Sequence, residues 1–304
     1  KKKKKKKKKK KYDGPWKTSP QSAAHAKGVV LMDEKSNTGV WITHSIPRFP
    51  VIRARGSKLE YPKSGLKYAQ TFMCTTFDLD KSGPKLFDHL INMKPLVYDR
   101  MVTSSLEKRF PKLHDLDLWI KMTRGSNRGT NDAELNQVIM TKGGQILRLF
   151  SKPRSVEKDL YSFIDEAIGA DLSVETWRNG AGGKVSSKCP KNDYHINNVD
   201  SLKYSTDQTW GYQQDHSKWA ISYEEDIATV CIGDSNRVES QFKRGGGAVC
   251  IRNPTTWALF NNTVAGIEGC PVSAKKGAGQ SMNLDPTVKT RVEQYMKAVT
   301  EANQ

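Results

Sequence analysis

One short pattern occurs twice in this chain, and each copy opens what the sequence predicts to be a β-hairpin. His25-Ala26-Lys27 precedes an apolar run, a polar turn and a second predicted strand that ends at Thr43-His44-Ser45. His216-Ser217-Lys218 precedes a similar pair of predicted strands that ends at Gly233-Asp234-Ser235-Asn236. Ser45 follows His25 by 20 residues, and Ser235 follows His216 by 19 residues. A lone His-x-Lys triplet arises by chance, but two copies at matched spacing predict two equivalent hairpins in one fold.

Alternate residues of a strand point to the same face, so the histidine and lysine of each copy project together. If the two copies pair about a pseudo-twofold axis, two imidazoles and two ammonium groups converge on one cleft. That arrangement suits a phosphodiester. Lysines stabilise charge on the non-bridging oxygens. One neutral imidazole can attack phosphorus, and a protonated imidazole can donate to the leaving oxygen. Histidine suits both tasks because its ordinary pKa is about 6.5.

The other polar residues near the two copies are candidates for supporting roles. His44 is interpreted as an orienting neighbour, whereas His89 and His114 are interpreted as structural. The residues expected to orient imidazoles or to bind phosphate oxygens are His44, Ser45, Asp234, Ser235 and Asn236. No cluster has metal-ligand spacing, so the sequence predicts chemistry without a metal or another cofactor.

Length and charge limit the class of protein. The chain has 304 residues and a net charge of +18, of which eleven charges belong to residues 1–11, all lysine. That run is interpreted as a tag or placeholder, disordered and outside the fold. The remaining body is moderately basic, which favours a nucleic-acid partner. With 36% hydrophobic residues the body can bury a core, and no apolar stretch reaches the ~18 residues of a membrane span.

Periodicity predicts a mixed α/β fold. Expected helices are the amphipathic stretch 157–170 and the stretch 285–299. Expected strands cover 28–33, 40–46, 67–77, 136–141, 145–150, 172–178, 219–223, 228–233 and 248–252. The repeated pattern divides the chain into two pseudo-symmetric α/β halves, residues 12–150 and 151–304, and each half contributes one His-x-Lys hairpin to a central cleft.

The five cysteines leave two interpretations open. None forms a Cys-x-x-Cys pair, and four lie in the last 116 residues. They suit two disulfides and one leftover thiol in an oxidising compartment, or five buried thiols in a cytosolic protein.

Seven segments, in order along most of residues 16–270, resemble the deoxyribonuclease II family of the phospholipase D-like superfamily. They are KTSP (17–20), HAKGVVLMD (25–33), WITHSIPRFP (41–50), YAQT (68–71), DHSKW (215–219), CIGDSNR (231–237) and RGGGAVC (244–250). The resemblance implies a phospholipase D-like fold and a metal-independent acid endonuclease that hydrolyses double-stranded DNA to 3′-phosphate and 5′-hydroxyl ends. It implies a phosphohistidine intermediate, with His25, Lys27, His216 and Lys218 as catalytic residues.

The resemblance also implies disulfides and a location. We expect Cys231–Cys250 and Cys189–Cys270 bridges, with Cys74 free or paired to a cysteine of a stretch that this chain lacks. The protein would be secreted or held in an acidic compartment, lysosome-like in a eukaryote and secreted or periplasmic in a bacterium. Both His-x-Lys copies lie in one chain, so a monomer would suffice, although a homodimer stays open.

Basic residues near the motifs are candidates for contacts with the DNA backbone. The main ones are Arg48, Arg237 and Arg244, and the alternative for each is ordinary solvated surface. Two other functions also stay open. One is a phospholipase D-like enzyme acting on another phosphodiester, such as a phospholipid headgroup. The other is a DNA-binding relative without catalysis, which the presence of both histidines and both lysines disfavours.

Overall fold

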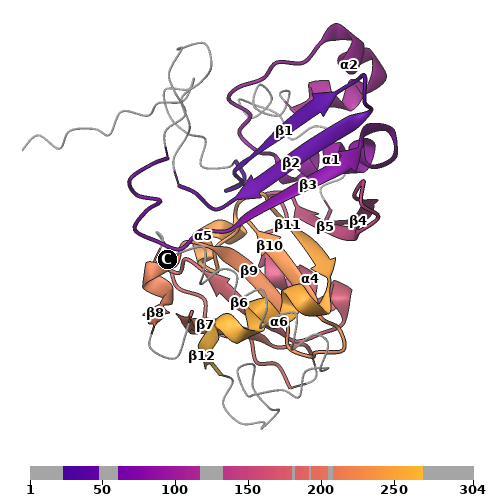
Figure 1. Ribbon diagram of the computed structural model, residues 1–304. Coiled ribbons are helices and arrows are strands. Elements are labelled where there is room, and N and C mark those ends of the chain that lie inside the picture. The colour runs from indigo at the N-terminus through magenta and orange to yellow at the C-terminus, as the bar shows by residue number, and fades with distance from the viewer. Residues whose placement is uncertain are drawn as a thin grey trace, which may run out of the picture.

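The computed structural model describes residues 23–47, 61–116, 133–179, 182–191, 193–204 and 208–269. Within these residues the chain forms a three-stranded sheet and a nine-stranded sheet, with helices packed on both (Figure 1). The mixed α/β class predicted from the sequence is therefore confirmed. The lysine run and the predicted helix 285–299 lie outside the described residues.

The smaller sheet carries the first His-x-Lys hairpin. Its order is β1 (Gly28–Asp33), β2 (Thr38–His44) and β3 (Phe72–Asp78), all antiparallel. Trp41 and Phe77 on its inner face are buried. Gly39 pairs with Phe77 across the strands, and a Cβ at position 39 would lie 2.2 Å from that ring. Glycine at this position therefore lets the phenylalanine ring lie flat over β2.

The larger sheet carries the second hairpin, β9–β10, at its centre. Along its main path the order is β12-β7-β6-β9-β10-β11-β5-β4, β8 pairs with β7, and β6–β7 is a parallel pair. The strands are β4 (Leu135–Met140), β5 (Ile146–Lys152), β6 (Leu172–Thr176), β7 (Ile196–Lys203), β8 (Thr209–Gly211), β9 (Lys218–Ser222), β10 (Thr229–Gly233), β11 (Gly246–Arg252) and β12 (Val264–Glu268). The predicted division between residues 150 and 151 falls within β5 and stays a prediction.

Aspartate side chains cap the starts of helices α1 and α4, and a glycine in the left-handed conformation ends α4. In α1 the Asp78 carboxylate accepts from the backbone N–H of Lys81 at 3.0 Å. In α4 Asp159 accepts from Tyr161, and Gly169 ends the helix at φ 72°. The helices are α1 (Leu79–Met93), α2 (Ser104–Arg109), α4 (Leu160–Ile168), α5 (Glu239–Phe242) and α6 (Pro254–Thr263), with short 3₁₀ turns η2 (Pro111–His114) and η3 (Tyr212–Gln214). Helix α4 confirms the predicted stretch 157–170, while no sequence pattern predicted α1 or α6.

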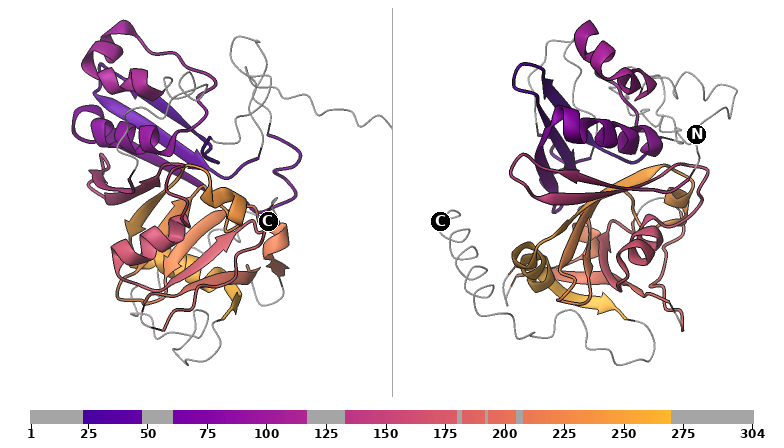
Figure 2. Two further views of the ribbon diagram at one scale, coloured as in Figure 1. Left: turned by 180° about the vertical axis from the view of Figure 1, so that it is seen from behind. Right: turned by 90° about the vertical axis from the view of Figure 1, so that its right-hand side faces the viewer.

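The larger sheet is covered on both faces, so its central strands are buried. One face packs against α4 through residues such as Tyr161 and Ile164. The other face packs against α1, α6 and the inner face of the smaller sheet, with Trp219 and Trp257 in that core. In the right-hand view of Figure 2, α1 and α4 lie on opposite sides of β4 and β5. This layering fixes the smaller sheet, and with it the first hairpin, against the strands that carry the second.

We expect a large-to-small change in β5 to test this core. Leu149→Ala should lower the free energy of unfolding by about 2–5 kcal/mol, because Leu149 is 0% exposed and its removal leaves a cavity. Val138→Ala on the neighbouring strand β4 is the control, since Val138 is 46% exposed, and it should change the free energy by about 0.5 kcal/mol or less. Urea denaturation measures both, and equal effects would contradict the packing described.

Candidate active site

The structure brings the two His-x-Lys copies together, and each histidine ring is held by the other copy's hairpin. His25 lies before β1, and its Nδ1 donates a hydrogen bond to the backbone oxygen of Asp234, 3.0 Å away and directly after β10. His216 lies before β9, and its Nδ1 donates to the backbone oxygen of Ser45, 2.8 Å away and directly after β2. Stretches 209 and 171 residues apart in the chain therefore meet at one place.

These two bonds also set the chemical form of both rings. A backbone carbonyl only accepts a hydrogen bond, so the proton of each neutral ring lies on Nδ1. The Nε2 of His25 and the Nε2 of His216 then carry a free lone pair. Such an atom can attack phosphorus or take up a proton. Both histidines are therefore held in the tautomer that either catalytic task requires.

A short segment that the sequence did not single out for a role, Ala69–Thr71, joins the two hairpins. The backbone N–H of His216 donates to the Ala69 oxygen at 2.9 Å, and the N–H of Thr71 donates to Ser45 Oγ at 2.9 Å. Ser45 Oγ donates to Gln70 Oε1 at 2.6 Å, and that oxygen lies 3.3 Å from His216 Nδ1. Ser45, only 1% exposed, thus uses its hydroxyl within this segment and its carbonyl on the imidazole.

Each lysine folds back onto its own copy. Lys27 Nζ donates to the backbone oxygen of His25 at 2.8 Å, and Lys218 Nζ donates to that of His216 at 2.6 Å. An ammonium has three N–H donors, so each lysine keeps donors for a further acceptor such as a phosphate oxygen. Burial lowers the pKa of Lys27 to about 8 and that of Lys218 well below its ordinary value. The two cations therefore lie in a region with little water to screen them.

The histidine pKa values show that all four groups share one electrostatic environment. Burial lowers the pKa of His25 well below 6.5, and Lys27, Lys218 and Arg244 lower it further. Burial lowers the pKa of His216 to about 3, with smaller contributions from Lys218 and Lys27. Because each ring is influenced by the lysine of the other copy, the two pairs are close in space. Near neutral pH both rings are unprotonated in the protein without substrate.

His44 lies at the edge of this group. Its backbone N–H donates to the Lys27 oxygen at 3.1 Å, and its ring stacks on Phe72 with centroids 5.6 Å apart. Burial, and then Lys27, lowers the pKa of His44 to about 4. Trp177, a residue that no sequence pattern indicated, packs instead against His216, at 5.4 Å between ring centroids.

The loop after β10 is a buried hydrogen-bonded unit. Asp234 Oδ1 accepts from Ser235 Oγ at 2.9 Å, and its Oδ2 accepts from the backbone N–H of Gly247 at 3.1 Å. The backbone oxygen of Ser235 accepts from Tyr161 Oη at 3.0 Å. Asn236 is 5% exposed, and its buried Oδ1 accepts no hydrogen bond from the described part of the chain. The loop thereby holds the Asp234 carbonyl in place beneath His25.

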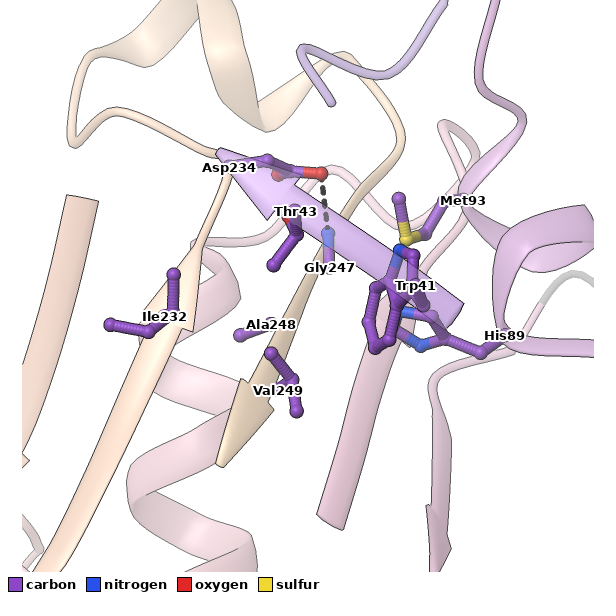
Figure 3. A pocket seen from close by; sticks show the side chains of 9 residues that line it. All are labelled: Trp41, Thr43, His89, Met93, Ile232, Asp234, Gly247, Ala248 and Val249. Atoms are coloured by element: carbon purple, nitrogen blue, oxygen red, sulfur yellow. Dashed lines mark hydrogen bonds between the residues drawn. The ribbon is translucent and has the colours of Figure 1, made fainter. Parts of the chain in front are cut away.

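A small pocket lies behind this loop, between β2 and α1 on one side and β10 and β11 on the other (Figure 3). Asp234 borders it, and the figure shows the carboxylate bonded to the backbone of Gly247. His89 also lines the pocket at 1% exposed, with its ring 5.7 Å from that of Trp41. Burial lowers the pKa of His89 to about 3, so it is a neutral core residue of α1 that packs close to Gly247 of β11.

The candidate DNA-contacting arginines lie in different surroundings. Arg244 Nε donates to the backbone oxygen of Ala23 at 2.7 Å, near His25. Arg237 is 1% exposed, and its guanidinium bonds to Asp159 Oδ2 at 2.9 Å, to Asn198 Oδ1 and to the Ser186 oxygen. The Arg237 guanidinium is thus occupied in the interior, where a DNA phosphate does not reach it. This environment disfavours the contact with DNA expected from the sequence, which stays a prediction, and the buried partner Asp159 at the start of α4 could not be foreseen from local pattern.

Other predictions concern cysteines and unplaced residues. Cys231 and Cys250 form a disulfide across β10 and β11, as expected. Cys74 is free and exposed. Cys189 is disulfide-bonded, while its predicted partner Cys270, like the predicted DNA contact Arg48, lies outside the described residues.

Two further searches cover the described residues alone. Within them no three His, Cys, Asp or Glu side chains cluster so as to hold a metal ion. None of the helices found there is long and apolar enough to cross a membrane.

Comparison with known proteins identifies the family of this chain. The family model for deoxyribonuclease II matches residues 5–270. The chain belongs to the deoxyribonuclease II family. Relatives include cell-death-related nuclease 7 of Caenorhabditis elegans, 31% identical over 86% of this chain and 68% of that protein. Plancitoxin-1 of Acanthaster planci is 33% identical over 81% and 65%, and deoxyribonuclease-2 of C. elegans is 33% identical over 78% and 59%.

Membership of the deoxyribonuclease II family confirms the resemblance seen in the sequence motifs and assigns the chain to a family of hydrolytic nucleases. The chain spans about two thirds or less of the length of these three relatives.

The buried ion pair gives a prediction. Arg237→Gln should lower the free energy of unfolding by about 3–5 kcal/mol, because it leaves the Asp159 carboxylate without its buried cation. Arg252→Gln, which removes an exposed guanidinium that donates to the Asp226 oxygen, should cost about 1 kcal/mol or less. Urea denaturation of both variants measures the difference. A stable Arg237→Gln protein with impaired DNA binding would instead restore the role expected from the sequence.

Proposed function

We propose that this chain hydrolyses phosphodiester bonds of double-stranded DNA as an endonuclease, with a phosphohistidine intermediate, best at acidic pH and without a metal ion. The observation that carries the proposal is the reciprocal binding of His25 and His216, which leaves both Nε2 atoms free beside Lys27 and Lys218. The family and the names of its members support DNA as the substrate.

The proposed reaction has two displacement steps at phosphorus. In the first, His25 Nε2 forms a bond to phosphorus, the bond from phosphorus to the 5′ oxygen breaks, and protonated His216 gives its proton to that oxygen. In the second, water attacks the phosphohistidine, His216 takes a proton from the water, and the phosphorus–nitrogen bond breaks. The products are a 5′-hydroxyl and a 3′-phosphate. Lys27 and Lys218 stabilise the charge on the non-bridging oxygens in both steps.

The assignment of His25 as nucleophile and His216 as acid rests on their different surroundings. His25 is influenced by three cations, Lys27, Lys218 and Arg244, and these oppose its protonation. Among the described residues His216 is influenced by two cations, Lys218 and Lys27, so fewer charges oppose its protonation. The two rings are close enough to titrate as a pair, so the protonation state belongs to both.

The matched contacts of the two hairpins support a pseudo-twofold relation between the halves 12–150 and 151–304. Each half supplies one imidazole, one ammonium and one carbonyl that binds the opposite ring. The site is complete within a single chain, so we propose a monomer as the minimal active unit, with a homodimer compatible. The Cys231–Cys250 disulfide supports a secreted location or an oxidising acidic compartment.

Digestion of supercoiled plasmid at pH 5 with EDTA tests the proposal. We expect nicked and linear products whose ends carry 3′-phosphate and 5′-hydroxyl groups. His25→Ala and His216→Ala should each lower cleavage by at least about 10³-fold while DNA binding persists, because each removes one of the two proton-handling or nucleophilic groups. His114→Ala, an exposed position on η2, is the control and should cut normally.

Three outcomes of that digestion and of parallel assays, with DNA binding and a phospholipid substrate, point elsewhere. Binding without cleavage in the unmodified protein would favour the non-catalytic relative. Cleavage of phospholipid headgroups but not of DNA would favour another phosphodiesterase. Dependence of plasmid cleavage on an added divalent cation would contradict the proposed chemistry.

The histidine environments predict how activity depends on pH. The reaction needs one neutral and one protonated imidazole, and the surroundings lower the pKa values of both His25 and His216. The required proton is therefore lost as pH rises. We expect kcat/KM to peak below about pH 6 and to fall about tenfold per pH unit above the apparent pKa. Initial rates measured between about pH 4 and 9 on one DNA substrate check this, and a maximum above about pH 8 would refute it.

A further inference from the structure

Lys152, at the end of β5, is a lysine in the protein interior. It is 0% exposed, and its ammonium donates to the backbone oxygens of Val156 at 3.0 Å, Phe242 at 2.9 Å and Arg244 at 2.7 Å. All three of its N–H donors are therefore used. A buried charge is costly unless it is fully hydrogen-bonded, so this lysine and the three carbonyls fix one another. The catalytic steps described above make no use of it.

The segment that Lys152 holds is the turn between α5 and β11, which has little freedom of its own. The backbone N–H of Arg244 donates to the Gln241 oxygen at 3.1 Å. A Cβ at Gly245 would lie 1.9 Å from the Met93 oxygen, and one at Gly246 would lie 2.3 Å from Ser235 Oγ. The turn is therefore pressed against α1 and the loop after β10. The backbone of Arg244 is fixed from several directions at once.

The Arg244 side chain reaches from this turn toward the first His-x-Lys copy. Its Nε donates to the backbone oxygen of Ala23, two residues before His25. The side chain is partly exposed, and no residue in the described part of the chain accepts from its Nη nitrogens. Its charge acts on both His25 and Lys27, whereas no arginine among the described residues acts on His216 in the same way. The described part of the site therefore has an additional cation beside His25.

We propose that Arg244 is a catalytic residue that contacts the non-bridging oxygens of the scissile phosphate on the His25 side, and that Lys152 is the positioning residue that holds it there. This inference rests on the proposed function and adds a third cation to it. A guanidinium matches phosphate geometry with two parallel N–H donors, and here the Nη pair is available for that contact. The hydrogen bond from Arg244 Nε to the Ala23 oxygen fixes the direction in which the two Nη nitrogens point.

A double-mutant cycle tests the two roles together. On duplex DNA at pH 5, Arg244→Gln should lower kcat about 10²-fold, because it removes a preorganised donor to the developing charge. Lys152→Met should lower kcat about tenfold, and the double variant should be no worse than Arg244→Gln within about twofold, since Lys152 acts through Arg244. Losses that multiply would overturn the positioning role. Arg252→Gln is the control and should keep full activity.

Two readouts separate a catalytic guanidinium from a merely structural one. Added guanidinium ion should restore Arg244→Ala at least about tenfold, should leave the activity of Arg252→Gln unchanged and should not restore His25→Ala. His25 is faced by Lys27 from the same segment before β1, Lys218 from β9, Arg244 from the α5–β11 turn and the Asp234 carbonyl after β10. Loss of Arg244 removes a cation that lowers the pKa of His25, and His25 must be neutral to attack, so the rising limb of the pH–rate profile on the acid side should move to higher pH. An unmoved profile with no rescue would overturn the catalytic role.

Phosphate binding keeps this inference distinguishable from the proposed function. Inorganic phosphate, measured by calorimetry at pH 5, should bind the unmodified protein at least about tenfold more tightly than Arg244→Gln. If that difference is seen but DNA is not cut, the proposal that Arg244 binds phosphate as a third cation is supported and the nuclease proposal fails. If DNA is cut and neither kcat nor phosphate affinity changes in Arg244→Gln, the inference fails and the nuclease proposal stands. If Lys152→Met does not fold, Lys152→Gln, which keeps donors for part of the set, replaces it in the cycle.

Discussion

The structure depends on two hydrogen bonds that cross between the hairpins, from His25 to the Asp234 carbonyl and from His216 to the Ser45 carbonyl. Each fixes a ring orientation and a tautomer, and both join the smaller sheet to the larger one at the site. The neighbouring segment Ala69–Thr71 adds backbone contacts to the same junction. Part of the docking of the smaller sheet on the larger one therefore comes from the contacts that set the geometry of the two imidazoles, beside the apolar core and the bond from the Lys142 N–H to the Thr76 oxygen.

The charges at this junction are unfavourable for folding. Lys27, Lys218 and Arg244 are brought close together out of water, and burial lowers the pKa of each. Asp234 partly compensates for them, although burial raises the pKa of its own carboxyl. In the proposed reaction, an anionic phosphate between the cations would relieve this repulsion, so the same charges would favour both phosphate binding and the folded state that carries it.

The sequence predicted the parts of this site that are carried by side-chain type and spacing. The repeat placed His25, Lys27, His216 and Lys218 on paired hairpins, and the structure brings those four together. Strand pairs β4–β5 and β9–β10 followed from apolar runs around short turns. Helix α1 was not predicted because Gly83 and Pro84, which disfavour a helix, lie inside it. Strand β7 was not predicted because its sequence, INNVDSLK, lacks an apolar run and places two buried asparagines within the sheet.

The sequence could not show the roles of two buried cationic residues. In the sequence Arg237 cannot be distinguished from a surface arginine. It forms an interior ion pair with Asp159 only because α4 packs against the loop after β10. Lys152 likewise looks like any polar residue at the end of a strand until three carbonyls surround it. Long-range partners, rather than local pattern, decide the role of such residues.

The groups that hold the imidazoles are peptide carbonyls, and every amino acid supplies one. Exchanges at positions 45 and 234 can alter hydroxyl or carboxylate contacts while the acceptor facing each ring stays in place, provided that the chain path is kept. Substitution of those side chains is therefore a poor indicator of lost catalysis. A search for active relatives is better guided by the backbone conformation at positions 45 and 234 than by residue identity there. To change the hydrogen bond at either Nδ1 atom, an engineer must likewise move the backbone that carries the acceptor.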